Sequence, residues 1–98
     1  MATYSVSNSK HATLTADAAD TVTITGTASN IRVVNHGGES AAPIYFTYGD
    51  NPTAATVAGN NTVVVLPADE TVVKYDGSNG KVSLICSAAM TYSVEAKD

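Results

Sequence analysis

The chain has 98 residues, the length of one small domain, and a formal net charge of −4 at pH 7. Its five cations are scattered along the sequence, so no basic surface suited to phosphates is predicted, and we exclude nucleic acid as the main partner. Val, Ala and Thr are abundant, Tyr is the dominant aromatic residue, Leu occurs only at positions 14, 66 and 84, and Trp is absent, which favours strands over helices.

The N-terminal segment carries a weak strand signal. TYSVS, residues 3–7, offers Tyr4 and Val6 as an alternating apolar pair. We therefore expect residues 1–11 to form an N-terminal arm or a weak edge strand, and residues 12–98 to form a single β-sandwich domain.

Two clearer strands are predicted next, in HATLTA (11–16) and DTVTITGT (20–27). In the second, Val22 and Ile24 face one way and the threonines face the other. This alternation is typical of a strand with one buried side and one side in water or at an interface.

A glycine-containing stretch separates the next two predicted strands, NIRVVNH (30–36) and PIYFTYGD (43–50). The first places Ile31, Val33 and Asn35 on one face and Arg32, Val34 and His36 on the other. Pro43 suits the start of the second strand, because proline cannot donate to a strand ladder. We interpret the whole stretch as a strand, a Gly-Gly turn and a second, aromatic strand.

The second half of the chain continues the pattern. The predicted strands are NTVVVLP (61–67), ETVVKYDG (70–77), GKVSLICS (80–87) and TYSVEA (91–96), and residues 76–80, DGSNG, form a strong turn signal. The longest connection, residues 51–61, is expected to project as a loop. Seven to nine short strands in all predict an all-β protein, a single antiparallel β-sandwich or small barrel.

His36-Gly37-Gly38-Glu39 is the one stretch that resembles a chemical site. His36 and Glu39 could bind a metal with His11 or Asp50 as a third ligand. However, the two glycines disfavour a helix that would align them, and no second ligand pair accompanies them. We therefore expect no metal and no cofactor.

Other catalytic patterns are weaker still. No serine lies in a G-x-S-x-G motif, and Asp69 and Glu70 are neighbours that would point to opposite faces of a strand. Asp50 and residues 76–79 lack the spacing of a calcium loop. Cys86 lies in an apolar run and is predicted to be a buried core residue. We expect no enzymatic activity.

Two kinds of binding protein remain. The aromatic residues Tyr45, Phe46, Tyr48 and Tyr92 could form a sugar-binding platform, so a carbohydrate-binding or adhesion module is one alternative. The Thr- and Val-rich strands with few charges favour instead a domain that works against other protein surfaces.

Four phrases carry a resemblance to a known class: RVVNHG, PIYFTYG, VAGNNT and SLICSAAMTYSVE. From about residue 12 onward the chain resembles small β-sandwich virion proteins of tailed bacteriophages. The resemblance implies a capsid decoration protein that binds the outer surface of the mature head, with a minor tail or head-to-tail connector component as the alternative.

The same resemblance implies the major capsid protein lattice as partner, and a homo-oligomer, for which a trimer would match threefold lattice positions. No stretch is apolar enough for a signal peptide or a membrane span, so we expect no membrane partner and synthesis in a cytosol. The resemblance implies that this is the host bacterial cytoplasm and that the final location is the outer capsid surface of the virion. The residues expected to make protein contacts are Tyr4, Val6, His36, Tyr45, Tyr48, Asn51, Pro52 and Val57.

Overall fold

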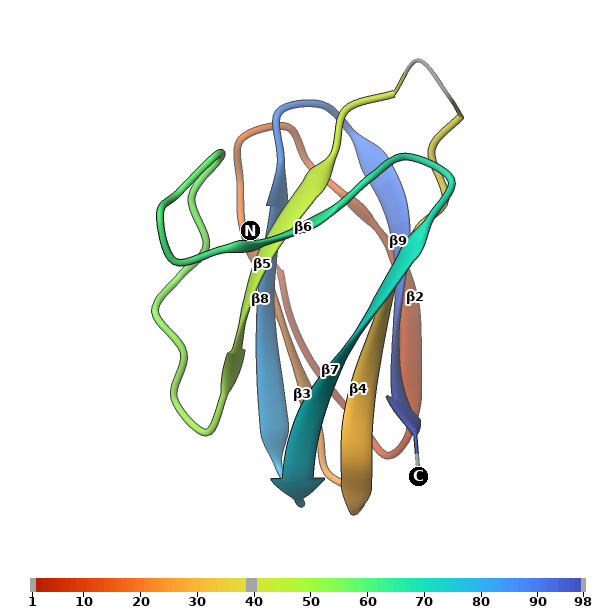
Figure 1. Cartoon of the computed structure of the whole chain (residues 1–98), viewed down its shortest axis with the longest axis vertical. Helices are drawn as coiled ribbons and strands as arrows, with labels where there is room; N and C mark the ends of the chain where they lie inside the picture. Colours follow the sequence, from red (N-terminus) through yellow and green to blue (C-terminus); the bar gives the residue numbers. More distant parts are fainter. Residues whose placement is uncertain (1, 39–40, 98) are drawn as a thin grey trace.

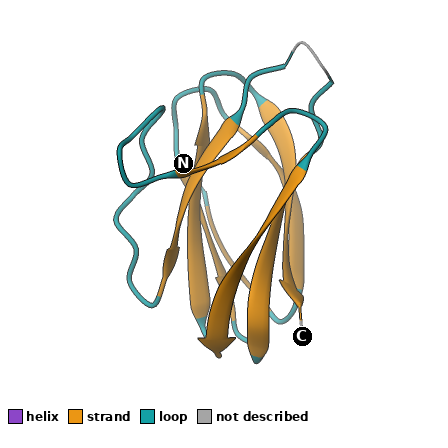
Figure 2. Cartoon of the chain, in the orientation of Figure 1, coloured by secondary structure: helices purple, strands orange, loops and turns teal. Residues whose placement is uncertain are grey.

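The computed structural model describes residues 2–38 and 41–97. This part of the chain consists of strands and loops, and none of its segments is a helix long and apolar enough to cross a membrane (Figure 2). Its nine strands are β1 (Thr3–Val6), β2 (Ser9–Leu14), β3 (Asp20–Ile24), β4 (Ala28–Asn35), β5 (Ile44–Gly49), β6 (Val63–Val65), β7 (Glu70–Gly77), β8 (Gly80–Cys86) and β9 (Met90–Lys97).

Two sheets form a sandwich, as the sequence predicted (Figure 1). The larger sheet has the order β1-β3-β8-β5-β6 and the smaller one the order β2-β9-β4-β7. All strand pairs are antiparallel except β1 with β3, which is parallel and sets Thr3 opposite Thr21. The boundary expected after residue 11, between an N-terminal arm and the domain, falls inside β2, so residues on both sides of it belong to one strand.

The core lies between the sheets and follows the predicted alternation. Val22 and Ile24 point inward from the larger sheet, Ile31 and Val33 point inward from the smaller one, and all four are buried. Cys86 is a free, buried thiol in the same cluster, as its apolar context predicted. Burial of these alternating side chains is the main favourable contribution to folding.

The connection between β5 and β6 does not simply project. Although it stands beside β5 in Figure 1, its Ala55 is buried against Ile85 and Tyr45 on the outer face of the larger sheet. The Ala55 backbone N–H donates a 2.9 Å hydrogen bond to Ser83 Oγ. The prediction of a projecting loop was therefore wrong for its middle, because outward-facing residues of β8 provide a surface for it to cover.

The stretch between β4 and β5 connects the two sheets, so it is not a turn within one sheet. Asn35, at the end of β4, is buried, and its Nδ2 donates to the carbonyl oxygens of Ala42 and Val65, each at 3.2 Å. Its Oδ1 accepts a 2.8 Å bond from the Gly37 N–H. One inward-facing amide therefore fixes the end of β4, the crossover and β6.

The predicted turn at residues 76–80 is confirmed, and it also carries the chain from one sheet to the other. Gly77 has φ 134° and Asn79 has φ 61°. Glycine and asparagine are the residues that most readily adopt positive φ, which explains why the sequence marks this reversal so clearly.

Candidate functional site

Both histidines of the chain lie at the outer face of the smaller sheet, His11 on β2 and His36 just after β4. Strand register places His11 opposite Ser93, and Ser93 opposite Val34. In the next row, Glu95 lies opposite Arg32, which lies opposite Val72. This face therefore mixes imidazole, hydroxyl and charged groups on four adjacent strands.

Ser93 lies between the two histidines of the chain. His11 Nδ1 and Ser93 Oγ form one hydrogen bond, and His36 Nε2 lies 2.6 Å from the same oxygen. Ser93 faces outward by strand alternation, yet only 1% of its surface is exposed, while both histidines are exposed. We infer that the two imidazoles cover the serine from β2 and from the end of β4.

This arrangement is a poor one for nucleophilic catalysis. An attacking serine must reach a substrate carbon, whereas Ser93 is sealed from solvent. Neither imidazole has a carboxylate hydrogen-bonded to it among the described residues, so the third member of a catalytic triad is missing there. The cluster therefore presents the two exposed imidazole rings of His11 and His36 at the surface.

Arg32 connects three strands beside this cluster. Its Nη2 lies 2.9 Å from Glu70 Oε1, and its Nη1 lies 3.3 Å from Glu95 Oε2. Partly exposed ion pairs of this kind contribute little to stability, roughly 0–1 kcal/mol each. Their electrostatic effect is clearer, because two carboxylates surround one guanidinium and leave this group with a net negative charge.

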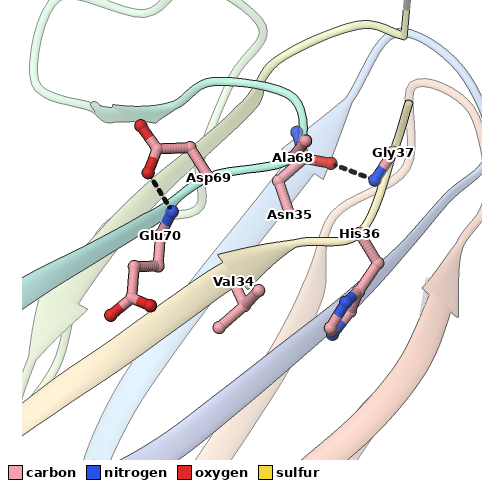
Figure 3. Close-up of a pocket in the computed structure, with 7 residues that line it drawn as sticks. All are labelled: Val34, Asn35, His36, Gly37, Ala68, Asp69 and Glu70. Atoms are coloured by element: carbon pink, nitrogen blue, oxygen red, sulfur yellow. Dashed lines mark hydrogen bonds between the residues drawn. The ribbon is translucent and has the colours of Figure 1, made fainter. Parts of the chain in front are cut away.

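A hollow of about 330 Å³ lies at the end of β4, next to the turn between β6 and β7 (Figure 3). Its lining includes His36, Asp69 and Glu70, but Figure 3 shows both carboxylates directed away from the imidazole. Asp69 Oδ1 accepts a 2.8 Å bond from the Glu70 N–H. Within residues 2–38 and 41–97, no three His, Cys, Asp or Glu side chains converge as metal ligands.

The fold brings together only some of the metal ligands considered from the sequence. His36 and His11 both contact Ser93, but Asp50 follows the C-terminal end of β5 and accepts a 2.5 Å bond from Tyr75 Oη. That bond and the Asp50 charge raise the pKa of Tyr75. Glu39 lies outside the described residues.

A buried polar pair joins the two sheets inside the core. Asp20 is 2% exposed, and its Oδ2 accepts a 3.0 Å hydrogen bond from Tyr92 Oη. Its Oδ1 accepts a 3.0 Å bond from the Ala2 N–H. Burial raises the pKa of Tyr92, and the negative charge of Asp20 raises it further. The pair cannot be predicted from local sequence, because Asp20 and Tyr92 are 72 positions apart and belong to different sheets.

The aromatic residues do not form a sugar-binding platform. Phe46 and Tyr92 are fully buried, and Tyr45 packs under the β5–β6 connection. Tyr48 alone among the four is exposed, with its ring centroid 6.0 Å from that of Phe46. A stacking surface for a sugar needs several exposed rings on one side, so the expected set does not provide one.

The residues expected to make protein contacts are dispersed over the molecule. Tyr4 and Val6 pack against the main core from β1, and Tyr45 is largely covered. The exposed members are His36, on the smaller sheet, and Tyr48, Asn51 and Val57, on or after β5 in the larger sheet; Pro52 is half-buried. They do not make up one continuous contact surface.

Sequence reasoning missed the most exposed apolar side chains. Val64 on β6, Leu66 just after it and Val72 on β7 are 44%, 59% and 49% exposed. Thr71 Oγ1 donates a 3.3 Å bond to the Val64 carbonyl, so the two edge strands meet here. We call these three residues the β6/β7 edge. The sequence does not predict the exposure of Val64 and Leu66, because they lie in the same apolar run, VVVLP, as the buried Val65.

No protein family matches the sequence, and no curated protein matches it. Among solved structures, the chain is similar to the pre-peptidase C-terminal domain of a collagenase from Bacillus anthracis, with TM-score 0.54 and 14% identity over 99% of this chain and 95% of that one. It is also similar to PliG, a periplasmic inhibitor of g-type lysozyme from Aeromonas hydrophila, with TM-score 0.50 and 12% identity over 96% of each chain. At these identities the likeness supports the fold alone.

Proposed function

We propose that this chain is a non-enzymatic virion structural protein, a capsid decoration protein that binds the outer surface of the mature head of a tailed bacteriophage. The phrases RVVNHG, PIYFTYG, VAGNNT and SLICSAAMTYSVE support the choice of virion class. The sealed Ser93 and the diverging carboxylates of the hollow support a role without catalysis.

One observation carries the proposal that this protein works by docking, namely the β6/β7 edge. Of the five large hydrophobic side chains that are exposed among the described residues, three belong to it. At this edge, Val64 points out of the larger sheet beside Tyr45, and Val72 points out of the smaller sheet beside Arg32. Large apolar side chains left exposed along one edge of a small domain favour a protein contact. The Aeromonas protein of similar fold is described as a lysozyme inhibitor, so a sandwich of this shape can serve as a protein-binding module.

The contact is expected to use side chains more than added strands. β6 is only three residues long, and the exposed positions of β7 include Glu70, Lys74 and Asp76. Short strands and charges are the usual features that discourage edge-to-edge pairing. The N-terminal strand already pairs with β3 of its own sheet. Burying the β6/β7 edge on the assembled head would then stabilise the lattice geometry that offers the matching surface.

Changing Leu66 to aspartate is expected to weaken binding to undecorated heads at least tenfold. Burying a leucine side chain contributes roughly 1.5–3 kcal/mol, and a carboxylate in its place adds a desolvation cost. The monomer should keep its stability because Leu66 is 59% exposed. Co-sedimentation with heads assembled without the protein gives the affinity, and thermal unfolding checks the fold.

Two variants serve as matched controls. Ser5→Asp adds the same charge on β1, at the other edge of the larger sheet, and should bind like the wild type. Val57→Asp tests the connection between β5 and β6. If Val57→Asp lost binding and Leu66→Asp did not, the contact would lie on that connection and not on the β6/β7 edge. Absence of saturable binding to heads, together with binding to tails, would reject decoration in favour of a minor tail or connector role.

A further inference from the structure

The chain has two histidines, 25 positions apart in the sequence, and the fold brings both to one point. His11 Nδ1 and His36 Nε2 are each within hydrogen-bonding distance of Ser93 Oγ. Both backbones are held against β9, because His11 on β2 pairs with Ser93 and the N–H of His36, just after β4, donates a 3.0 Å bond to the Thr91 carbonyl. The separation of the two ring nitrogens therefore cannot exceed two hydrogen-bond lengths.

We propose that His11 and His36 form a binding site for a divalent transition-metal ion of the Zn²⁺ type. The ligands are Nδ1 of His11 and Nε2 of His36, and water fills the remaining positions. Imidazole nitrogens suit Zn²⁺, Cu²⁺ and Ni²⁺, whereas Ca²⁺ and Mg²⁺ require oxygen ligands. Binding requires the two exposed rings to turn these nitrogens from Ser93 Oγ toward one ion, with Zn–N bonds of roughly 2.0–2.1 Å.

The same face carries charges of both signs, because Arg32 is held by Glu70 and Glu95, and Lys74 and Lys97 lie farther along the sheet. The buried Cys86 thiol has no access to solvent and cannot compete for the ion. In the described part of the chain no third His, Cys, Asp or Glu converges with the two rings, so two protein ligands are proposed there and water for the other positions.

This inference does not depend on the proposed role in the virion, and its test uses the protein alone. The tag-free chain is titrated with ZnCl₂ by calorimetry, and imidazole ¹⁵N shifts are followed by NMR. We expect one Zn²⁺ per chain, with both histidines shifting together and Mg²⁺ giving no signal. Ser93→Ala should retain Zn²⁺ binding, because it removes only the hydroxyl between the rings.

Removing either ring is the decisive change. His11→Ala and His36→Ala should each weaken Zn²⁺ binding at least tenfold, and His11→Asn and His36→Asn, which retain a polar group, should do the same if alanine disturbs folding. Circular dichroism confirms that each variant is folded. The proposal is overturned if the wild type binds no Zn²⁺ at millimolar concentration, or if either single variant binds as tightly as the wild type.

Discussion

Changing Tyr92 to phenylalanine is expected to lower the free energy of unfolding by about 2 kcal/mol at pH 7. The phenyl ring fills the same space, but the buried Asp20 carboxylate loses the hydroxyl that lies 3.0 Å from its Oδ2. Leaving a buried charged acceptor without its donor costs roughly 1–3 kcal/mol or more. Urea denaturation followed by circular dichroism measures the change.

Tyr48→Phe is the matched control for this prediction. Tyr48 is exposed, and no hydrogen bond of its hydroxyl is seen among the described residues. Its replacement should change stability by less than about 0.5 kcal/mol. Equal stability of Tyr92→Phe and wild type would show that the Asp20 contact makes no net contribution.

The same pair predicts a loss of stability in alkali. Burial and the Asp20 charge raise the pKa of Tyr92, so the folded protein keeps this proton at pH values where an unfolded tyrosine, with an ordinary pKa of about 10, releases it. The contribution is complete below about pH 10 and declines as pH rises above it, because the unfolded state then binds fewer protons. Tyr92→Phe lacks this ionisation. The deficit of Tyr92→Phe relative to wild type should therefore narrow as the pH rises above about 10, and a constant deficit would contradict the assignment.

Strand alternation predicted the fold because each strand has one buried side. Val22 and Ile24, or Ile31 and Val33, are two residues apart in the sequence and so share a face. The same rule correctly placed Asn35 on the buried face and His36 on the exposed face. It could not predict what the inward amide does, because Ala42 and Val65 reach Asn35 only through the crossover between sheets.

The histidine cluster depended on strand order, which local sequence does not encode. His11 and Ser93 are 82 positions apart and meet only because β2 pairs with β9, and His36 joins them because β4 lies on the other side of β9. The burial of Tyr92 and the covering of β8 by Ala55 are also tertiary effects. Periodicity identifies which side of a strand faces the core, but it does not say which outward residues acquire partners.

Asn35 is the residue whose change is expected to have the largest effect. Its side chain makes three hydrogen bonds, in which Nδ2 donates to two carbonyl oxygens and Oδ1 accepts from Gly37. Aspartate has nearly the same shape but lacks the two N–H donors. In Asn35→Asp, a buried carboxylate would face the carbonyl oxygens of Ala42 and Val65 at hydrogen-bonding distance. Both the repulsion and the desolvation of the charge disfavour the folded state.

We therefore expect Asn35→Asp to lower the free energy of unfolding by about 3 kcal/mol or more at pH 7, measured by urea denaturation. In acid, a protonated carboxyl regains one donor, so the deficit relative to wild type should be smaller near pH 4 than at pH 7. Asn30→Asp is the control, because Asn30 lies partly exposed on the outer face of β4, opposite Lys74 and Lys97, where a new carboxylate is tolerated. If the two variants were equally stable, the crossover between the sheets would not depend on the Asn35 amide, and the connection from β4 to β5 would be held by the packing of its neighbours alone.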